Sequence, residues 1–158
     1  MFNISEKIEH RVISFGVIMY WWLFWLLNVI DKVIGKGIPM FEGKDRMAAF
    51  VKYFGSIGID NPAVAGGTLL FVSIVEFLAL VFLTIAIYYW FKKKYVLTRG
   101  AMFYGILTSL FVFSFFAIGD QIFGDRVELL EHSIYWMALI ISWIVFTRHD
   151  MIDSRKNR

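Results

Sequence analysis

Four long apolar stretches constrain this chain more than any other feature. They cover about residues 12–30, 64–90, 102–122 and 129–147. A helix needs about 20 mostly apolar residues to cross the hydrocarbon core of a bilayer, and each stretch comes close to or exceeds that length. Backbone polar groups in lipid must be hydrogen-bonded within a helix or a closed barrel. Because the stretches are continuous rather than alternating, we predict four transmembrane helices.

The four spans and their connections use up all 158 residues. We therefore predict a single domain, residues 1–158, that folds as an all-α, four-helix, up-down bundle embedded in a membrane. The second and third connections are short, which makes the helices on either side of each antiparallel neighbours. Hydrophobic residues make up 59% of the chain, and no room is left for a separate soluble domain. This excludes the glycine-rich phosphate loops and βαβ units of soluble nucleotide enzymes.

The first connection, from about Asp31 to Pro62, contains a segment with helical periodicity. Within RMAAFVKYFGSIGI, four apolar residues recur at helical spacing, namely Met47, Phe50, Val51 and Phe54. Arg46 and Lys52 lie off this apolar stripe. The pattern predicts a short amphipathic helix that lies on the outer surface of the membrane.

Lysine and arginine are distributed unevenly over the connections and termini. Ten of the sixteen would lie inside if both termini are cytoplasmic, namely Lys7, Arg11, Lys92, Lys93, Lys94, Arg99, Arg148, Arg155, Lys156 and Arg158. Cytoplasmic segments of membrane proteins carry an excess of basic residues. We therefore expect an inner membrane protein of a bacterium or archaeon with both termini in the cytoplasm. This topology explains the net charge of +3 better than binding to nucleic acid does.

The chain has no cysteine, which excludes disulfides, thiol nucleophiles and thiolate-bound iron–sulfur clusters. Haem is also disfavoured, because His10 and His149 lie at the predicted inner surface and His132 near the outer one. No cofactor is predicted with certainty. A quinone or a bound lipid stays open as an alternative.

Glu76 is the first candidate functional residue. It lies about twelve residues into the second span, which at about 1.5 Å per residue places it about 18 Å deep, near the membrane midplane. An ionisable side chain at that depth is expensive and faces the interior of a bundle. It can serve as a proton relay or a ligand contact. The alternative is a structural anchor, bonded to a serine or threonine of a neighbouring helix.

A second group of polar residues gathers at the outer ends of the predicted spans: Asn28, Asp31, Lys32, Asp120, Gln121 and His132. In one bundle these residues could line a polar mouth that leads down to Glu76. Glu128 and His132 share a helix face, a spacing that suits a metal ion or a carboxylate that tunes the imidazole. A solvated helix start explains the same spacing more simply, so no metal site is predicted.

Three tryptophans lie in the middle of the first span instead of at its ends. Trp21 and Trp25 share one face of the predicted helix, and Trp22 is offset from them. A quinone or a pigment could pack against such a surface. Packing inside the bundle or against a partner subunit is the commoner reason for it.

Three sequence features resemble a known family in their order along the chain. They are Lys32 in NVIDKVIGKG, the segment FVKYFGSIGIDNPAVAGG, and Glu76 in LLFVSIVEFLALVFLTIAI. In this order the chain resembles the DoxX-like family of four-helix membrane proteins, over about residues Val12 to Trp90. The resemblance implies that Lys32 and Glu76 correspond to the lysine and the glutamate of that family's pattern. The related DoxD family is the membrane part of a thiosulfate:quinone oxidoreductase, so the resemblance also implies quinone-linked chemistry.

Three functions follow as hypotheses. The first is a non-catalytic accessory subunit of a larger respiratory or other energy-converting complex, in contact with the lipid bilayer and other membrane subunits. The second is a quinone-linked oxidoreductase component of the DoxD type. The third is a small proton-coupled transporter, which would have to oligomerise because four spans are few for one chain.

Overall fold

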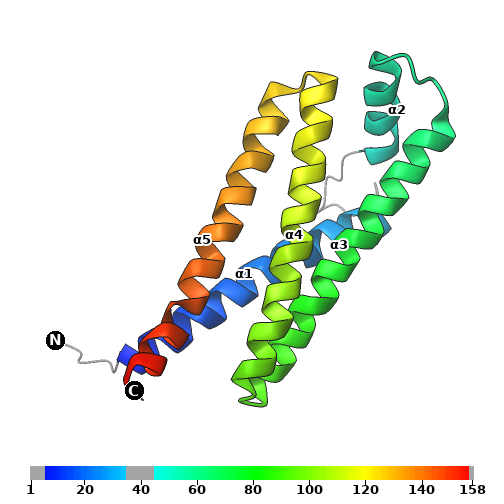
Figure 1. Ribbon diagram of the computed structural model, residues 1–158. Helices are drawn as coiled ribbons and strands as arrows, with labels where there is room; N and C mark the ends of the chain where they lie inside the picture. Colours follow the sequence, from blue (N-terminus) through cyan, green and yellow to red (C-terminus); the bar gives the residue numbers. More distant parts are fainter. Residues whose placement is uncertain (1–5, 35–44, 157–158) are drawn as a thin grey trace.

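The computed structural model describes residues 6–34 and 45–156, and side chains over residues 8–9, 11–32 and 45–148. Within these ranges the regular structure is helical (Figure 1): α1 (Glu6–Ile34), α2 (Arg46–Ser56), α3 (Pro62–Phe91), α4 (Tyr95–Phe123) and α5 (Arg126–Lys156). Helices α1, α3, α4 and α5 are long and apolar enough to cross a membrane, and α2 is short. The predicted all-α bundle of four spans with a short helix in the first connection is confirmed.

Each predicted span lies inside a longer helix. The third one, for example, begins at Tyr95 instead of about residue 102, and the fourth continues past residue 147 to Lys156. The prediction followed the apolar runs, which Arg99 and Arg148 interrupt. Charged residues end the part of a helix that suits hydrocarbon, but they do not end the helix itself.

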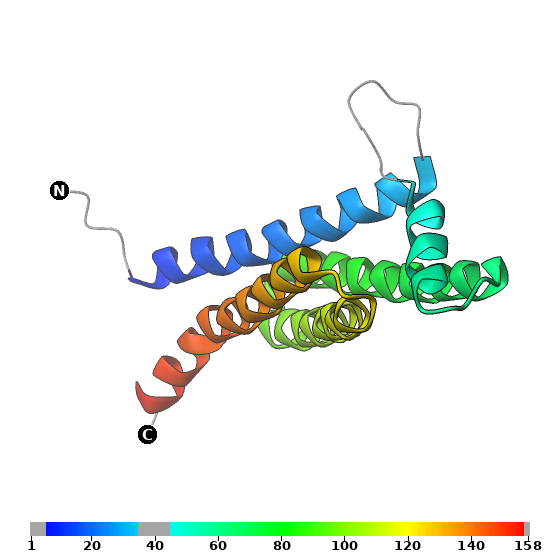
Figure 2. The same cartoon turned by 90° about the horizontal axis from the view of Figure 1, so that it is seen from above.

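The long helices run up, down, up and down. Helix α3 packs against both α1 and α4, α4 packs against α5, and α2 lies across one end of α3 and α4. Figures 1 and 2 show α1 crossing the other long helices at an angle. The start of α1, the end of α5 and the α3–α4 turn lie at one end of the bundle. Helix α2 and the α4–α5 turn lie at the other end.

The tight turn between α4 and α5 depends on Gly124 and Asp125. Gly124 adopts φ 77°, a left-handed conformation that glycine takes without a steric penalty, and its N–H bonds to the carbonyl of Asp120. Asp125 then accepts a hydrogen bond at Oδ1 from the backbone N–H of Glu128, which caps the start of α5. The turn therefore brings the last residues of α4 beside the first turns of α5.

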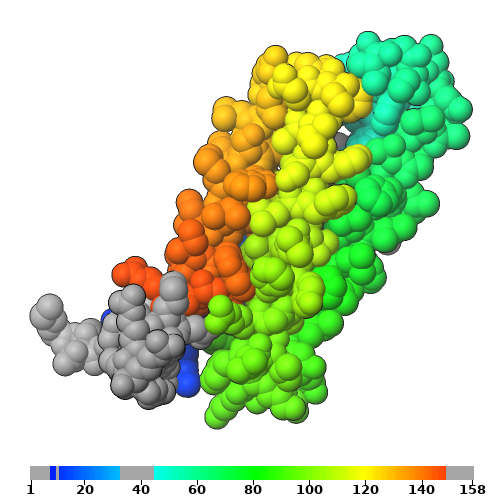
Figure 3. Space-filling model, viewed as in Figure 1, coloured from blue at the N-terminus to red at the C-terminus, as the bar shows by residue number. Residues whose placement is uncertain are grey.

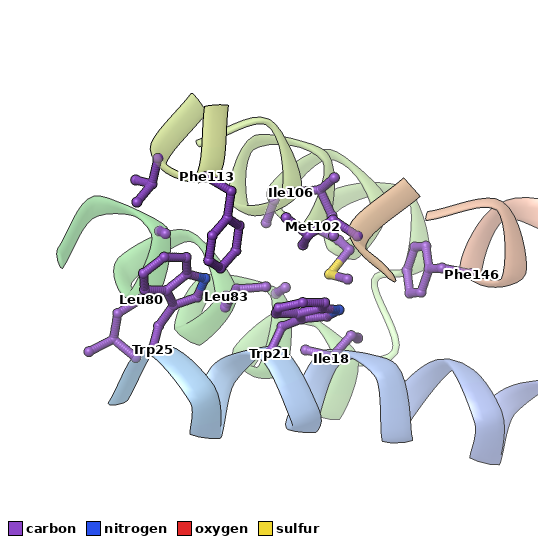
Figure 4. Close-up of a cluster of buried hydrophobic side chains, with 14 of the residues drawn as sticks. Ile18, Trp21, Trp25, Leu80, Leu83, Met102, Ile106, Phe113 and Phe146 are labelled. Carbon is purple, nitrogen blue, oxygen red and sulfur yellow. The ribbon is translucent and has the colours of Figure 1, made fainter. Parts of the chain in front are cut away.

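The core is built around the two tryptophans that share a face of α1. Figure 4 shows Trp21 and Trp25 directed from α1 toward the labelled side chains of α3 and α4, and each is 1% exposed. The indole of Trp25 donates to Ser109 Oγ of α4 at 2.8 Å, and that of Trp21 donates to Ser142 Oγ of α5 at 3.0 Å. Polar side chains that bond across helices hold membrane bundles together. The expected packing of these tryptophans inside the bundle is confirmed.

Large apolar side chains cover the outer faces of the long helices. Leu70 and Phe77 of α3, Ile118 of α4 and Ile141 of α5 are each more than half exposed. An apolar surface of this extent is a liability in water and is the normal surface of a helix in lipid. The chain is therefore a multi-span integral membrane protein whose outer faces contact the bilayer.

Candidate functional site

A cavity of about 480 Å³ lies between α2 and the adjoining parts of the four long helices. Figure 3 shows α2, in cyan, beside α3 and α4 at this end of the molecule. The volume falls in the range of small-molecule sites, about 300–1,000 Å³. Its aromatic lining residues are Phe24, Trp25, Phe50, Tyr53, Phe54, Phe113, Phe115, Phe116, Phe123 and Tyr135. Its polar and charged lining residues are Asn28, Lys32, Arg46, Thr68, Glu76, Asp120, Glu128, Glu131 and His132.

An ion pair between Lys32 and Glu76 lies in the wall of this cavity. Glu76 of α3 is 1% exposed, and its carboxylate binds the ammonium group of Lys32, in the last turn of α1. A buried carboxylate without a partner is strongly unfavourable, so the ammonium compensates for the burial of Glu76. The structure thus pairs Glu76, predicted to lie near the membrane midplane, with Lys32, predicted to lie at the polar mouth. The partner of Glu76 is a lysine, not the hydroxyl that the structural alternative called for.

A second ion pair ties α2 to α1. Arg46, the first residue of α2, places Nη2 at 3.3 Å from Asp31 Oδ2. Its Nε atom is buried and has no hydrogen-bond partner among the described residues. Since Arg46 also lines the cavity, its guanidinium can donate to a molecule bound there.

Asp120 and His132 form a pair in another part of the wall. Asp120 Oδ2 of α4 lies 2.6 Å from His132 Nδ1 of α5, and Asp120 is 6% exposed. The imidazole stacks on Phe116, with ring centroids 4.8 Å apart and planes at 22°. The carboxylate and the stacked ring fix the imidazole. Because Asp120 occupies one ring nitrogen, the other is the one that a ligand would meet.

Three side chains near the α4–α5 turn have the chemistry of metal ligands. Ligand atoms of Asp120, Glu128 and His132 all lie within 4.8 Å of one another. Mixed carboxylate and imidazole sets suit several divalent cations. These residues are the ones in the described part of the chain that could hold a metal ion. The absence of a metal site stays a prediction.

Tyr53 anchors α2 on the α4–α5 turn. Its hydroxyl donates to Asp125 Oδ2 at 3.2 Å, and its ring stacks on Phe123, with centroids 5.3 Å apart. Burial, followed by the nearby charge of Glu128, raises the pKa of Tyr53 from 10.0 to about 12. The phenol is therefore held in its protonated form as a hydrogen-bond donor, which helps α2 to cover the cavity.

The structure brings most of the candidate residues together. Asn28, Lys32, Asp120 and His132 line the same cavity as Glu76. Asp31 is not among the lining residues but pairs with Arg46, which is, whereas Gln121 is exposed and accepts a hydrogen bond from Arg126 at 2.8 Å. The side chains of His10 and His149 lie outside the described residues.

Sequence reasoning missed the contribution of α2 to the site. Phe50 and Phe54 of the predicted stripe do line the cavity, but Met47 and Val51 are 39% and 38% exposed. Arg46 and Tyr53 line it instead, and they are seven residues apart, so they share one helix face. That spacing was the available signal. The apolar stripe alone does not mark the face of α2 that meets the cavity.

Three comparisons with known proteins find no relative: no family model, no curated protein and no solved structure matches this chain. The class of protein therefore follows from the fold and the site alone. It is a four-span membrane protein with an aromatic cavity at one end of the bundle.

The Lys32–Glu76 ion pair predicts strong coupling between these two residues. Glu76→Leu leaves the ammonium of Lys32 without its carboxylate, so we expect the free energy of unfolding to fall by about 3–5 kcal/mol. Lys32→Met together with Glu76→Leu should cost less than the sum of the single variants. Denaturation in detergent micelles, analysed as a double-mutant cycle, measures this coupling. Lys52→Met serves as the control for loss of a lysine, and additive single effects would contradict the pairing.

The docking of α2 predicts a tyrosine that ionises at unusually high pH. In the folded protein Tyr53 should lose its proton near pH 12, and Tyr53→Phe should remove that step from an absorbance titration of phenolate. Since the folded pKa exceeds the unfolded one, the stabilisation from this phenol is complete below pH 10 and is lost as the pH rises toward 12. The control Tyr104→Phe, at an exposed position on α4, should keep the step. A phenolate amplitude near pH 12 that is unchanged in Tyr53→Phe would show that α2 is not docked in this way.

Proposed function

We propose that this chain is a quinone-binding subunit of a larger redox complex in the membrane. The observation that carries the proposal is the cavity, whose walls are aromatic and which is flanked by two polar pairs, Lys32–Glu76 and Asp120–His132. A quinone head group is a flat ring with two carbonyl oxygens on opposite sides. Aromatic side chains stack on such a ring, while Lys32 can donate an N–H group to one of its oxygens, and the free ring nitrogen of His132 can do so when both ring nitrogens carry a proton.

The residue content of the chain supports a role within a larger assembly. Quinone reduction consumes two electrons, and the chain has no cysteine with which to hold an iron–sulfur cluster. Another subunit would therefore supply or accept the electrons. The exposed apolar faces of the long helices leave surface for such a neighbour as well as for lipid. The alternative is an accessory subunit of such a complex that binds no quinone. A measurement of quinone binding distinguishes the two.

The contact between Lys32 and Glu76 also supports a relationship to the DoxX-like proteins. These two residues match the lysine and the glutamate of the family's pattern, and they lie 44 positions apart in the sequence. Their pairing gives the resemblance a physical basis, because each charge in the apolar interior needs the other. We propose on this ground that the chain is a distant DoxX-like protein.

Quinone binding can be measured by fluorescence, because Trp25 lines the cavity. Titration of the detergent-solubilised protein with a short-chain ubiquinone or menaquinone analogue should quench its fluorescence saturably. Lys32→Gln with Glu76→Gln should weaken binding about tenfold, or about 1.4 kcal/mol, the scale of one hydrogen bond from a charged donor. Separately, Phe116→Ala should weaken binding by a similar factor through the loss of ring stacking. Phe77→Ala, on the lipid-facing side of α3, is the matched control and should bind as the wild type does. Equal quenching of all four proteins would indicate partition into the micelle and would overturn the proposal.

We also propose that both termini lie in the cytoplasm. Arg11, Lys92, Lys93, Lys94 and Arg99 lie at the end of the bundle where α1 begins, and acidic residues such as Asp120, Asp125 and Glu128 lie at the cavity end. This separation supports the orientation, because basic segments stay on the cytoplasmic side.

The absence of native cysteine makes the orientation simple to test. Single variants Asp60→Cys and Lys93→Cys place a thiol in exposed positions near opposite ends of α3. An impermeant thiol reagent should label Asp60→Cys in intact cells and Lys93→Cys only after permeabilisation. The reverse pattern would place the cavity on the cytoplasmic side.

A further inference from the structure

Four apolar side chains that line the cavity are also exposed on the outside of the bundle. They are Ile57, the C-cap residue of α2, and Phe115, Ile118 and Ile122 of α4. Ile118 and Ile122 are 62% and 58% exposed, whereas Phe113, which lines the cavity from the same helix, is 3% exposed. A lining residue that stays more than half exposed is expected at the rim of an opening, not in a closed wall. We call this set of four residues the lateral rim.

The α4 part of the lateral rim is one stripe of the helix. Residues spaced by three and four positions share a helix face, so Phe115, Ile118 and Ile122 lie in line. Phe111, four residues earlier, continues the stripe and is 51% exposed. Phe71 of α3 meets the rings of Phe111 and Phe115 edge to face, at centroid distances of 6.3 and 6.0 Å. These rings hold α3 against the first half of the stripe, and Ile118 and Ile122 follow beyond this contact.

Helices α3 and α4 separate beyond these rings. Figure 1 shows the two helices close together near the turn that joins them and farther apart toward α2. There the end of α2 meets the end of α4, where the rings of Tyr53 and Phe54 contact Phe123 at centroid distances of 5.3 and 5.4 Å. Leu69 of α3 also lines the cavity. The lateral rim therefore lies where α2, α3 and α4 come together around the cavity.

The lateral rim lies in a part of the chain that suits hydrocarbon. Its three α4 residues belong to Tyr95–Phe123, a helix long and apolar enough to cross a membrane. Large exposed apolar side chains in such a span contact lipid chains. Glu131 of α5, by contrast, is an exposed acidic residue of the lining and accepts a hydrogen bond from the Tyr135 hydroxyl at 3.0 Å. The lateral rim is thus the apolar side of the cavity and faces the bilayer.

We propose that the lateral rim admits the ligand of the cavity from the bilayer and that the apolar tail of this ligand lies along the α4 stripe. The inference rests on the proposed quinone site and names its ligand class, which is a membrane quinone with a long isoprenoid tail. A cavity of about 480 Å³ is in the range of drug-sized molecules, so it suits a quinone head group and cannot enclose a long tail as well. The tail must leave the cavity, and the lateral rim gives it an apolar exit. Aromatic and branched aliphatic side chains there offer the van der Waals contacts on which packing in lipid depends.

The test uses a ubiquinone analogue whose tail carries a photoreactive diazirine. The full-length protein in detergent is irradiated with the analogue, with and without an excess of unmodified ubiquinone, and the labelled residues are identified by mass spectrometry of its peptides. Labelling that the excess suppresses should concentrate between Phe111 and Ile122 of α4 and near Leu69 and Phe71 of α3. The same diazirine tail without a head group should label all lipid-facing helices, and unmodified ubiquinone should not suppress that labelling.

Two matched variants test the role of the lateral rim. Ile118→Trp adds volume where the tail is expected, and the suppressible labelling should fall about tenfold, because a group forced into occupied space is strongly disfavoured. Ile141→Trp makes the same change on α5, where Ile141 is 60% exposed and is not a lining residue of the cavity. This control should be labelled as the wild type is.

The outcomes separate this inference from the proposed function. Suppressible labelling on α1 or α5, or an equal effect of both tryptophan variants, would overturn the lateral rim as the entry and leave the quinone site in place. Labelling that excess ubiquinone suppresses at no residue would overturn both, because the analogue would then only have partitioned into the micelle. The wild-type labelling map needs no variant, so it decides the inference even if Ile118→Trp does not fold.

Discussion

The ion pair between Lys32 and Glu76 is the interaction on which the arrangement of this end of the bundle depends. Neither charge is tolerable alone among apolar side chains, so the end of α1 must lie against the middle of α3. That contact sets where the chain enters its first connection. Arg46 bonds to Asp31, one residue before Lys32, so α2 begins beside the same pair. The ion pair thus helps to decide both the tilt of α1 and the position of the helix that covers the cavity.

The two ends of the bundle differ in charge and in what they can bind. At the α2 end, aromatic rings and paired polar groups line a cavity. At the other end, the exposed side chain of Arg11 lies over the ring of Tyr95, and Lys92, Lys93 and Lys94 follow the end of α3. A mainly aromatic lining with a few polar groups favours a small, flat and largely apolar molecule. The cavity at the α2 end is therefore where we place the proposed quinone.

Much of the fold could be predicted from the sequence, because continuous apolar runs leave a chain few alternatives in lipid. Helix α2 was also predictable, from the spacing of Phe50 and Phe54. The candidate residues Lys32 and Glu76 stood out singly, since charges in or beside apolar spans are rare, but no local pattern links residues 44 positions apart. The pairing of Asp120 with His132 is easier to predict from the sequence, because only a short turn separates the two helices that carry them. The role of Tyr53 depends on how α2 docks, which periodicity alone does not determine.

The most direct test of the quinone-binding role is native mass spectrometry of the assembly extracted gently from its own membrane. We expect this chain to leave the membrane in a reproducible assembly with larger subunits and to carry an added mass that fragments as a quinone. Dissociation should release that mass together with this chain, since the cavity is formed by its own five helices. A chain that is recovered alone, with no bound molecule at the cavity, would contradict both the binding role and the place in a redox complex.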